Sequence, residues 1–286
     1  MRTFAYEQPS TLDEALGLLA APAGEARPLA GGTDLIIRLR DGTLRPTLVV
    51  DVKAIPELRP GIELAGDRLT IGATTVMTDI AADPRIRRHF LALAEAALVV
   101  GSVQIRNRAT LAGNLCNASP AADTATPLLA HGAIVVLTGP AGTRRVALDA
   151  FFIRSGTTVL EPGELMVAIE LPVPSGGSAS VHLRRTRRRG HDLASVTMSC
   201  VIDDRGVTRL AYGSVGPRPM VVVDETGVLA DPRAGDDARS AVLARALASA
   251  TPSATSMRAG PDYRLAMLEV LARRAVTAAQ DRLASA

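Results

Sequence analysis

The strongest constraint on this sequence is a pair of glycine-containing turns that lie far apart in the chain. The first is Leu29-Ala30-Gly31-Gly32-Thr33-Asp34-Leu35, and the second is Thr110-Leu111-Ala112-Gly113-Asn114. Glycine lets the backbone take positive φ and approach a ligand closely, and successive exposed N–H groups form a concavity that binds anions such as phosphate. Side chains that form hydrogen bonds accompany both turns: Thr33, Thr110, Asn114 and Ser119. The pattern predicts one site with two walls for a large, diphosphate-containing cofactor.

Several other classes of site do not fit the sequence. Neither turn contains the GxGxxG fingerprint of a Rossmann fold, and no GK[ST] sequence marks a P-loop. Two cysteines cannot supply the four ligands of an iron–sulfur cluster, and the four histidines lack the spacing of a metal site. We therefore expect no metal site and no catalytic dyad in this chain.

Composition limits the partners and the cellular location that we expect for the chain. The net charge of +3 is too small to indicate nucleic acid as a partner. No apolar run is long enough for a membrane span, and the N-terminal residues lack the apolar core of a signal peptide. The expected location is the cytoplasm.

The pattern of apolar residues and turns predicts an N-terminal region of mixed helices and strands. A compact unit of about residues 1–55 begins with a helix whose capping box pairs Thr11 with Glu14. A second unit covers residues 56–175, and it includes a helix from Pro84 to about Val100. Another helix is predicted from Ser119-Pro120 to near His131. The expected strands of these units are 27–30, 47–52, 69–73, 133–137 and 165–171.

The best domain boundary is the segment 172–178, which is rich in proline, glycine and serine. Beyond it, residues 176–286 are predicted to form a separate C-terminal domain. A hairpin turn at 203–206 joins two of its strands. The expected strands are 180–187, 194–203 and 207–215, and the expected helices are 234–250 and 262–283.

The sequence resembles the FAD-binding (medium) subunits of molybdenum hydroxylases, a family that includes carbon monoxide dehydrogenase, xanthine dehydrogenase and aldehyde oxidoreductases. The resemblance covers nearly the whole chain. It is carried by AGGTD at 30–34, IGA at 71–73, IRNRATLAGN at 105–114, ASPAAD at 118–123 and the strand 164–172. It implies an α+β fold: an FAD-binding domain of the vanillyl-alcohol-oxidase (PCMH) type in two subdomains over residues 1–175, followed by a smaller α+β domain over 176–286.

The resemblance also implies which residues bind FAD. The cofactor would lie extended between the subdomains, with its diphosphate held by the two turns and Ser119 beside them. Asp123 matches the acid near the adenosine ribose, although a carboxylate there also suits the start of a helix. Val100 and Met166 match positions whose backbones approach the cofactor, and plain core packing has equal weight for both. Taken together, the implied cofactor-binding residues are Leu29, Ala30, Gly31, Gly32, Thr33, Asp34, Leu35, Val100, Thr110, Leu111, Ala112, Gly113, Asn114, Ser119, Asp123, Met166 and Arg184.

Two departures from the family pattern concern the flavin. Arg184 stands where relatives often carry a lysine close to the flavin ring. It also opens a run of arginines that ends at Arg189, and a simpler interpretation is that most side chains of this run face solvent. Thr186 and Leu193 occupy a strand region where relatives often have aromatic residues. No histidine lies in the first turn, so the resemblance implies noncovalent FAD. Cys116 fits a small packing residue better than a redox thiol.

The function implied by the resemblance is electron transfer. A molybdopterin-containing large subunit would oxidise the substrate and a small subunit with [2Fe–2S] clusters would relay electrons to FAD, which would pass them to NAD, oxygen or another acceptor. One alternative is a stand-alone FAD-dependent oxidoreductase that acts directly on a small organic molecule. A second is a noncatalytic assembly or cofactor-binding module.

Overall fold

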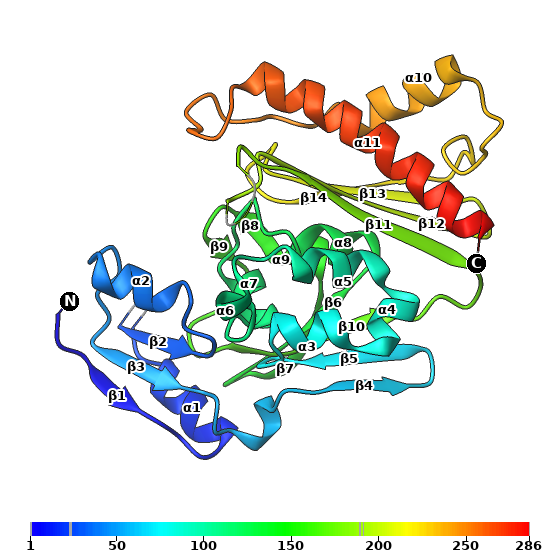
Figure 1. Ribbon diagram of the computed structural model, residues 1–286. Helices are drawn as coiled ribbons and strands as arrows, with labels where there is room; N and C mark the ends of the chain where they lie inside the picture. The colour runs from blue at the N-terminus through cyan, green and yellow to red at the C-terminus, as the bar shows by residue number, and fades with distance from the viewer. Residues whose placement is uncertain (1, 23–24, 189, 191, 286) are drawn as a thin grey trace.

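The computed structural model describes residues 2–22, 25–188, 190 and 192–285, so Arg189 of the arginine run lies outside the described residues. Figure 1 shows a small sheet at lower left, a central block of helices on a larger sheet, and a third sheet above them that two helices cover. This arrangement confirms the α+β class. None of the described helices is long and apolar enough to cross a membrane.

The N-terminal sheet has three parallel strands in the order β1-β3-β2. Thr11 caps the first helix by accepting a hydrogen bond from the Glu14 amide at 3.3 Å, as the sequence predicts. Strand β1 was not predicted, because it is short and exposed along its length. The elements are β1 (Ala5–Glu7), α1 (Leu12–Leu19), β2 (Ala26–Leu29), α2 (Leu35–Arg40) and β3 (Leu48–Asp51).

The larger sheet has five antiparallel strands in the order β4-β5-β10-β6-β7. Its three central strands match the predicted ones to within two residues. The two outer strands were missed because most of their side chains face solvent. The strands are β4 (Ile62–Ala65), β5 (Arg68–Gly72), β6 (Ile134–Gly139), β7 (Gly142–Ala147) and β10 (Leu165–Pro172).

Short helices connect these strands, and two of the predicted helices were wrong in extent. The helix expected from Pro84 to Val100 breaks at Phe90, whose ring is fully buried and packs edge-on against His131. The helix expected from Ser119 begins only at Ala125, because tight turns occupy residues 119–124 and the Pro120 carbonyl accepts a hydrogen bond from the Ser214 amide at 2.6 Å. The segments are η1 (Pro56–Leu58), α3 (Met77–Ala82), α4 (Pro84–His89), α5 (Leu91–Leu98), α6 (Val103–Arg106), α7 (Leu111–Cys116), α8 (Ala125–Ala130), α9 (Leu148–Phe151), β8 (Phe152–Arg154) and β9 (Thr157–Thr158).

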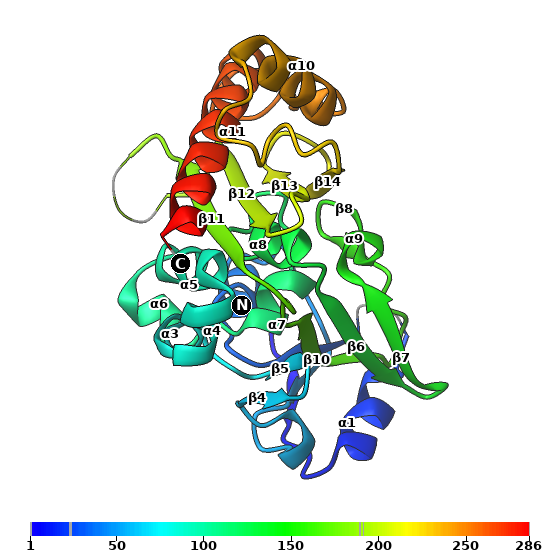
Figure 2. The same cartoon turned by 90° about the vertical axis from the view of Figure 1, so that its right-hand side faces the viewer.

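The C-terminal sheet has four antiparallel strands in sequence order, with the predicted hairpin turn between its second and third strands. Every residue of β12 is buried, because α11 covers one face of the sheet while α5 and α8 pack on the other (Figures 1 and 2). The residues of β12 that pack with α11 are apolar, whereas Thr197 and Ser199 on the other face are small and polar and Val201 joins the core of the preceding region. The elements are β11 (Ser178–Arg185), β12 (Val196–Asp203), β13 (Thr208–Gly213), β14 (Met220–Asp224), α10 (Asp236–Leu247) and α11 (Pro261–Ala284).

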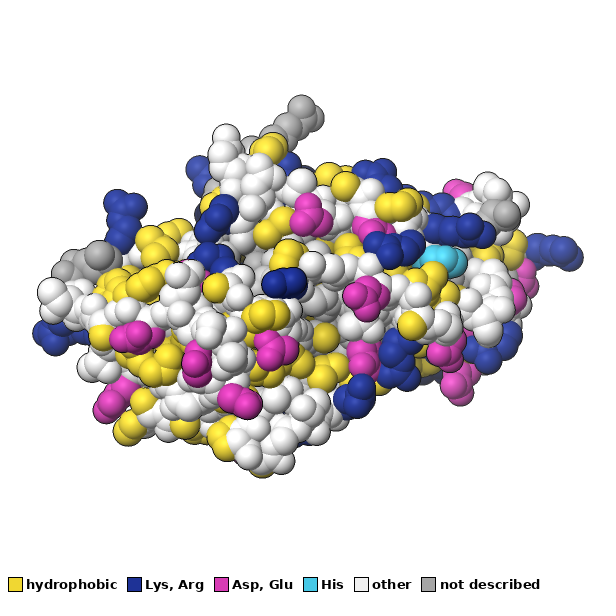
Figure 3. Space-filling view, turned by 90° about the horizontal axis from the view of Figure 1, so that it is seen from below, with side chains coloured by type: hydrophobic (Ala, Val, Ile, Leu, Met, Phe, Trp, Pro, Cys, Tyr) yellow, Lys and Arg dark blue, Asp and Glu magenta, His cyan; other side chains and the backbone are white. Residues whose placement is uncertain are grey.

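Strand β10 ends at Pro172 and strand β11 begins at Ser178, so the segment 172–178 connects two sheets. The division of the chain into two domains at this segment stays a prediction. On the face in Figure 3, basic and acidic side chains are interspersed rather than gathered by sign. The described side chains of that face therefore form no continuous basic stripe.

Candidate cofactor-binding site

Both glycine turns line a pocket of about 880 Å³, which extends to the edge of the C-terminal sheet. All of the predicted site residues line it except Leu29 and Leu111. Leu111 is fully buried in the main core, and Leu29 packs beneath the first turn, where a Cβ on Gly32 would lie 2.9 Å from its Cδ1. Those two side chains therefore support the turns from behind. The lining residues that the sequence predicted are Ala30, Gly31, Gly32, Thr33, Asp34, Leu35, Val100, Thr110, Ala112, Gly113, Asn114, Ser119, Asp123, Met166 and Arg184.

The first turn leads from the end of β2 into α2 and leaves its amides available. Gly32 has φ +76°, a conformation that favours glycine. Within the described part of the chain, no acceptor receives a hydrogen bond from the amides of residues 31–34. A row of free amides around a positive-φ glycine is the geometry that binds an anion.

The second turn is held much more firmly. Thr110 pairs with Val76 in an isolated β-bridge, and the Leu111 amide donates to the Thr75 carbonyl at 3.1 Å. The Thr110 hydroxyl caps α7 by accepting a hydrogen bond from the Gly113 amide at 3.1 Å. The two turns also meet backbone to backbone, because a Cβ on Gly31 would lie only 2.1 Å from the Arg108 carbonyl oxygen. Glycine at position 31 is therefore required by the close contact between the two walls.

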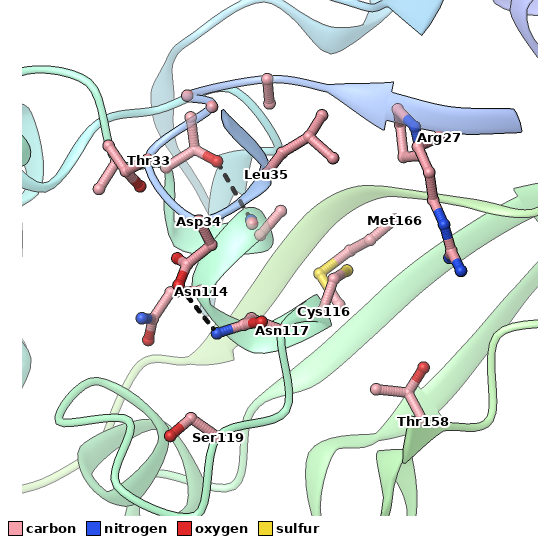
Figure 4. Close-up of a pocket in the computed structure, with 18 of the residues that line it drawn as sticks. Arg27, Thr33, Asp34, Leu35, Asn114, Cys116, Asn117, Ser119, Thr158 and Met166 are labelled. Atoms are coloured by element: carbon pink, nitrogen blue, oxygen red, sulfur yellow. Dashed lines mark hydrogen bonds between the residues drawn. The ribbon is translucent and has the colours of Figure 1, made fainter. Parts of the chain in front are cut away.

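Two amide side chains join and orient the walls (Figure 4). Asn117 Nδ2 donates to Asp34 Oδ1 at 3.3 Å, which links the second turn to the first. Thr124 Oγ1 donates to Asn114 Oδ1 at 2.7 Å, so the amide group of Asn114 remains free to donate. Surrounding protein atoms desolvate Asp34 and raise the pKa of its carboxyl, an effect that Arg38 partly offsets. The role of Asn117 was missed, although it follows the second turn closely in the sequence.

Arg27 was also missed, because it lies on the strand that precedes the glycine turn and outside the turn itself. It lies on β2, and its side chain extends into the pocket in Figure 4. Its Nε is buried and makes no hydrogen bond to any described residue. Desolvation lowers the pKa of its guanidinium, and the nearby Arg38 lowers it further. A half-buried guanidinium whose Nε has no partner among the described residues is suited to an anionic ligand at the pocket wall.

The opposite wall carries a cation that is fully engaged. Arg184 Nη1 donates to Asp123 Oδ2 at 2.7 Å and to the Val99 carbonyl at 2.8 Å, while its Nη2 donates to the Asp192 carbonyl. The sequence placed Asp123 and Arg184 separately near the cofactor, and the structure joins them in one ion pair. By contrast, Arg185, Arg187 and Arg188 are exposed, as the solvated-face interpretation expects.

Sulfur chemistry is not favoured at this site. Cys116 lines the pocket as a free thiol, and burial raises its pKa to about 12. It therefore stays protonated near neutral pH and behaves as a small packing residue. Over the described ranges, no group of three or more histidine, cysteine, aspartate or glutamate residues is placed to hold a metal ion.

Comparisons with known proteins converge on one family. The family model of the FAD-binding domain in molybdopterin dehydrogenase matches residues 2–174, and that of the CO dehydrogenase flavoprotein C-terminal domain matches residues 181–279. The chain is 33% identical over 285 residues to the carbon monoxide dehydrogenase medium chain of Hydrogenophaga pseudoflava, covering 98% of both chains. It is 32% identical over 281 residues to the xanthine dehydrogenase FAD-binding subunit of Escherichia coli O157:H7, covering 96% of this chain and 95% of that one. A solved structure of reconstituted CO dehydrogenase from Oligotropha carboxidovorans superposes with a TM-score of 0.91 at 30% identity, covering 98% of this chain and 99% of the other.

Proposed function

Because this chain belongs to the FAD-binding medium subunits of the molybdenum hydroxylase family, we propose that it is the electron-transfer subunit of a multi-subunit dehydrogenase. It binds FAD noncovalently and takes electrons from the [2Fe–2S] clusters of a small partner subunit. A molybdopterin-containing large subunit performs the substrate oxidation. The electrons leave to an acceptor such as NAD or oxygen.

The observation that carries this proposal is that both glycine turns line the same 880 Å³ pocket. The free amides of residues 31–34 and the unpartnered Nε of Arg27 converge on the same cavity. A diphosphate supplies the negative charge that both features lack. The residues of the pocket therefore fit FAD.

Within this arrangement each wall has its own task. The amides of the first turn and Arg27 bind the diphosphate, while Thr110, Asn114 and Ser119 orient the cofactor from the second turn. On the far wall, Asp123 is proposed to lie near the adenosine ribose and Arg184 near the flavin ring. Bound FAD would supply the redox chemistry, and the protein would bind, orient and tune it.

Noncovalent attachment is supported by the lining of the pocket. Among the described residues that line it, none is a histidine, and the Cys116 thiol is protonated near neutral pH. A histidine ring and a cysteine thiolate are the usual side-chain groups that attach a flavin covalently. We expect acid precipitation of the protein to release the flavin into solution. Flavin that stays with the precipitate would contradict noncovalent binding.

The same lining supports a relay rather than direct substrate chemistry. Among the described residues that line the pocket, no hydroxyl or thiol is paired with a histidine base. His182, whose ring contacts the hydroxyls of Thr126 and Ser199, lies outside this lining. Electron transfer needs no such pair. Both cysteines are free thiols, which suits the reducing cytoplasm as the place of action.

The test is to mix the FAD-loaded chain with its large and small partner subunits and substrate, and to follow flavin bleaching by stopped flow. Fast bleaching in the complex with almost none in the isolated chain is the expected result. Fast bleaching of the isolated chain by a small organic substrate would overturn the relay and support a stand-alone oxidoreductase. Poor retention of FAD with no flavin reduction would indicate an assembly module.

A further inference from the structure

A buried serine at the end of β13 joins three segments that lie far apart in the chain. Ser214 directly follows the last residue of β13 and is 3% exposed. Its amide donates to the Pro120 carbonyl at 2.6 Å, its hydroxyl donates to the Ala194 carbonyl at 2.9 Å, and its carbonyl accepts a hydrogen bond from Arg264 Nη1. The direction of each bond is fixed, because amides and guanidinium groups only donate and carbonyls only accept. Each of the three polar groups of Ser214 therefore holds a different segment.

The backbone of Ser214 is kept in an uncommon conformation. Its φ is +66°, in the left-handed region that residues other than glycine rarely adopt. The preceding Gly213 leaves no room for a side chain, since a Cβ there would lie 2.7 Å from the Pro120 carbonyl oxygen. A residue stays in such a conformation only where its surroundings fix it. The three hydrogen bonds and the close approach to Pro120 fix it here.

Two of the three segments form part of the wall of the cofactor pocket. The turn that contains Pro120 continues to Asp123, and Leu193 directly precedes Ala194. Both Asp123 and Leu193 line the pocket, whereas Ser214 does not. Ser214 therefore supports this wall from behind and would not touch the cofactor.

The same two segments hold the side chain of Arg184. Its Nη1 donates to Asp123 Oδ2 at 2.7 Å and its Nη2 donates to the Asp192 carbonyl. Asp123 belongs to the turn that the Ser214 amide holds, and Asp192 lies two residues before the carbonyl that the Ser214 hydroxyl holds. Ser214 thus fastens two of the three acceptors of this guanidinium, and the third is the Val99 carbonyl.

The third bond of Ser214 connects this wall to the helix that covers the C-terminal sheet. Arg264 lies near the start of α11 and is 3% exposed. While its Nη1 donates to the Ser214 carbonyl, its Nη2 donates to the Ser253 carbonyl at 2.6 Å in the loop before the helix. One buried guanidinium therefore clamps the serine from the side away from the pocket.

We propose that Ser214 is a positioning residue for the cofactor. Clamped by Arg264, it fixes the two acceptor segments, so that the charge of Arg184 stays close to the flavin ring. The placing of Arg184 beside the flavin rests on the proposed function. A cation there stabilises the reduced, anionic flavin, and its effect falls as the separation from the ring grows.

The test is the midpoint potential of the FAD-loaded full chain. Arg184→Gln removes the cation and should move the potential to more negative values. Ser214→Gly removes the hydroxyl but keeps the amide, the carbonyl and the positive φ, and it should move the potential in the same direction by a smaller amount. Added to Arg184→Gln it should cause no further shift, because it acts through the charge already lost. A wild-type potential in Ser214→Gly, or shifts that add, would overturn the proposal.

Two further variants separate positioning from simple stability. Ser180→Ala also removes a buried hydroxyl, which accepts the Ala92 amide at 3.0 Å, but Ser180 does not line the pocket. It should lower thermal stability and leave the potential unchanged. Arg264→Met should shift the potential as Ser214→Gly does, and Arg264→Lys, which can still donate to the Ser214 carbonyl, should restore part of it. Equal shifts in Ser180→Ala and Ser214→Gly would assign the effect to stability and overturn the positioning role.

A chain that retains no FAD would contradict the proposed function, and the role of Ser214 is then decided in the cofactor-free protein. Ser214→Gly and Arg184→Gln form a double-mutant cycle on the free energy of unfolding. Residues of one hydrogen-bond network show an interaction energy in such a cycle, whereas independent residues add. Coupling between the two variants is expected. Additive losses would show that Ser214 does not hold Arg184.

Discussion

The two glycine turns look alike in sequence but differ in how the fold treats them. In the first, the amides of residues 31–34 have no acceptor among the described residues, and Gly32 is held at positive φ. In the second, Thr110 caps the helix, a β-bridge ties it to Val76, and Leu111 is buried in the core. The first turn is therefore a cradle that keeps hydrogen-bonding capacity for a ligand, and the second is a scaffold that uses most of its own.

The difference teaches that a glycine motif can bind a ligand or support the turn that does. Changes in the first turn should mainly affect cofactor binding, whereas changes in the second should affect stability as well. The contact between Gly31 and the Arg108 carbonyl joins the two effects.

The largest effect is expected for Gly31→Ala. Its Cβ would lie 2.1 Å from a backbone oxygen, so the two turns must separate. Overpacking of this kind costs about 1–3 kcal/mol, and the pocket should lose most of its flavin. Thermal unfolding and the flavin-to-protein ratio measure both effects. The matched control is Gly17→Ala in α1, where a Cβ meets nothing within 4 Å, and where alanine should stabilise the helix by up to ~1 kcal/mol. A Gly31→Ala protein with normal stability and normal flavin content would contradict the contact.

Gly32→Val and Gly113→Val test whether both turns belong to the cofactor site. Valine at Gly32 is strained at φ +76° by about 1–2 kcal/mol and crowds the path of the diphosphate. At Gly113, a Cβ would lie 2.8 Å from Thr110 Oγ1, which threatens a cap worth about 1 kcal/mol. Both variants should bind FAD more weakly in a fluorescence titration, and both should keep the C-terminal sheet folded. If both variants bind FAD like the wild type, the turns are not part of the site.

Arg27→Gln should move affinity and stability in different directions. A charge-assisted hydrogen bond is worth about 1.5–3 kcal/mol, so FAD affinity should fall by roughly ten- to a hundredfold. The cofactor-free chain should be as stable as the wild type or more stable, because the buried Nε of Arg27 has no partner in the described residues. Arg38→Gln, at an exposed position beside the pocket, is the control for a change of charge alone. Equal losses of affinity in the two variants would assign the effect to charge rather than to Arg27.

A smaller effect is expected for Asn117→Ala. It removes the 3.3 Å hydrogen bond that links the walls through Asp34, a contribution of about 0.5–1.5 kcal/mol. The dissociation rate of FAD should rise several-fold with little change in thermal stability. Asp34→Asn should retain part of the link, because its side-chain oxygen can still accept. Identical dissociation rates in Asn117→Ala and the wild type would show that this bond does not hold the walls together.

The smallest effect is expected for Cys116. Burial raises its pKa to about 12, so the reactive thiolate is present only in strongly alkaline solution and is lost as the pH falls below that value. Iodoacetamide near neutral pH should leave Cys116 unmodified in the folded chain and modify it in denaturant. Cys116→Ser should leave the flavin potential unchanged. Rapid alkylation of the native protein, followed by mass spectrometry, would show that the thiol is not shielded.

The sequence by itself determined the features that depend on residues close together in the chain. Apolar alternation and turn residues located the central strands of the five-stranded sheet and the hairpin at 203–206, and the spacing of the glycine motifs identified the family. Local patterns could not place β1, β4 or β7, because exposed strands carry little apolar signal. Nor could they show that the helix at 84–100 breaks at Phe90, where burial of an aromatic ring outweighs local helix preference.

Only the tertiary structure decided how residues distant in the chain meet. It turned Leu29 and Leu111 away from the pocket and brought Arg27 into it. It joined Asp123 to Arg184 and set His182 behind them, across a separation of about sixty residues in the sequence. The strength of such hydrogen bonds and ion pairs changes when the distance between the two atoms changes by a few tenths of an ångström, and it rises when the atoms are buried from water. The distance and the burial are both set only when separate strands and helices pack together.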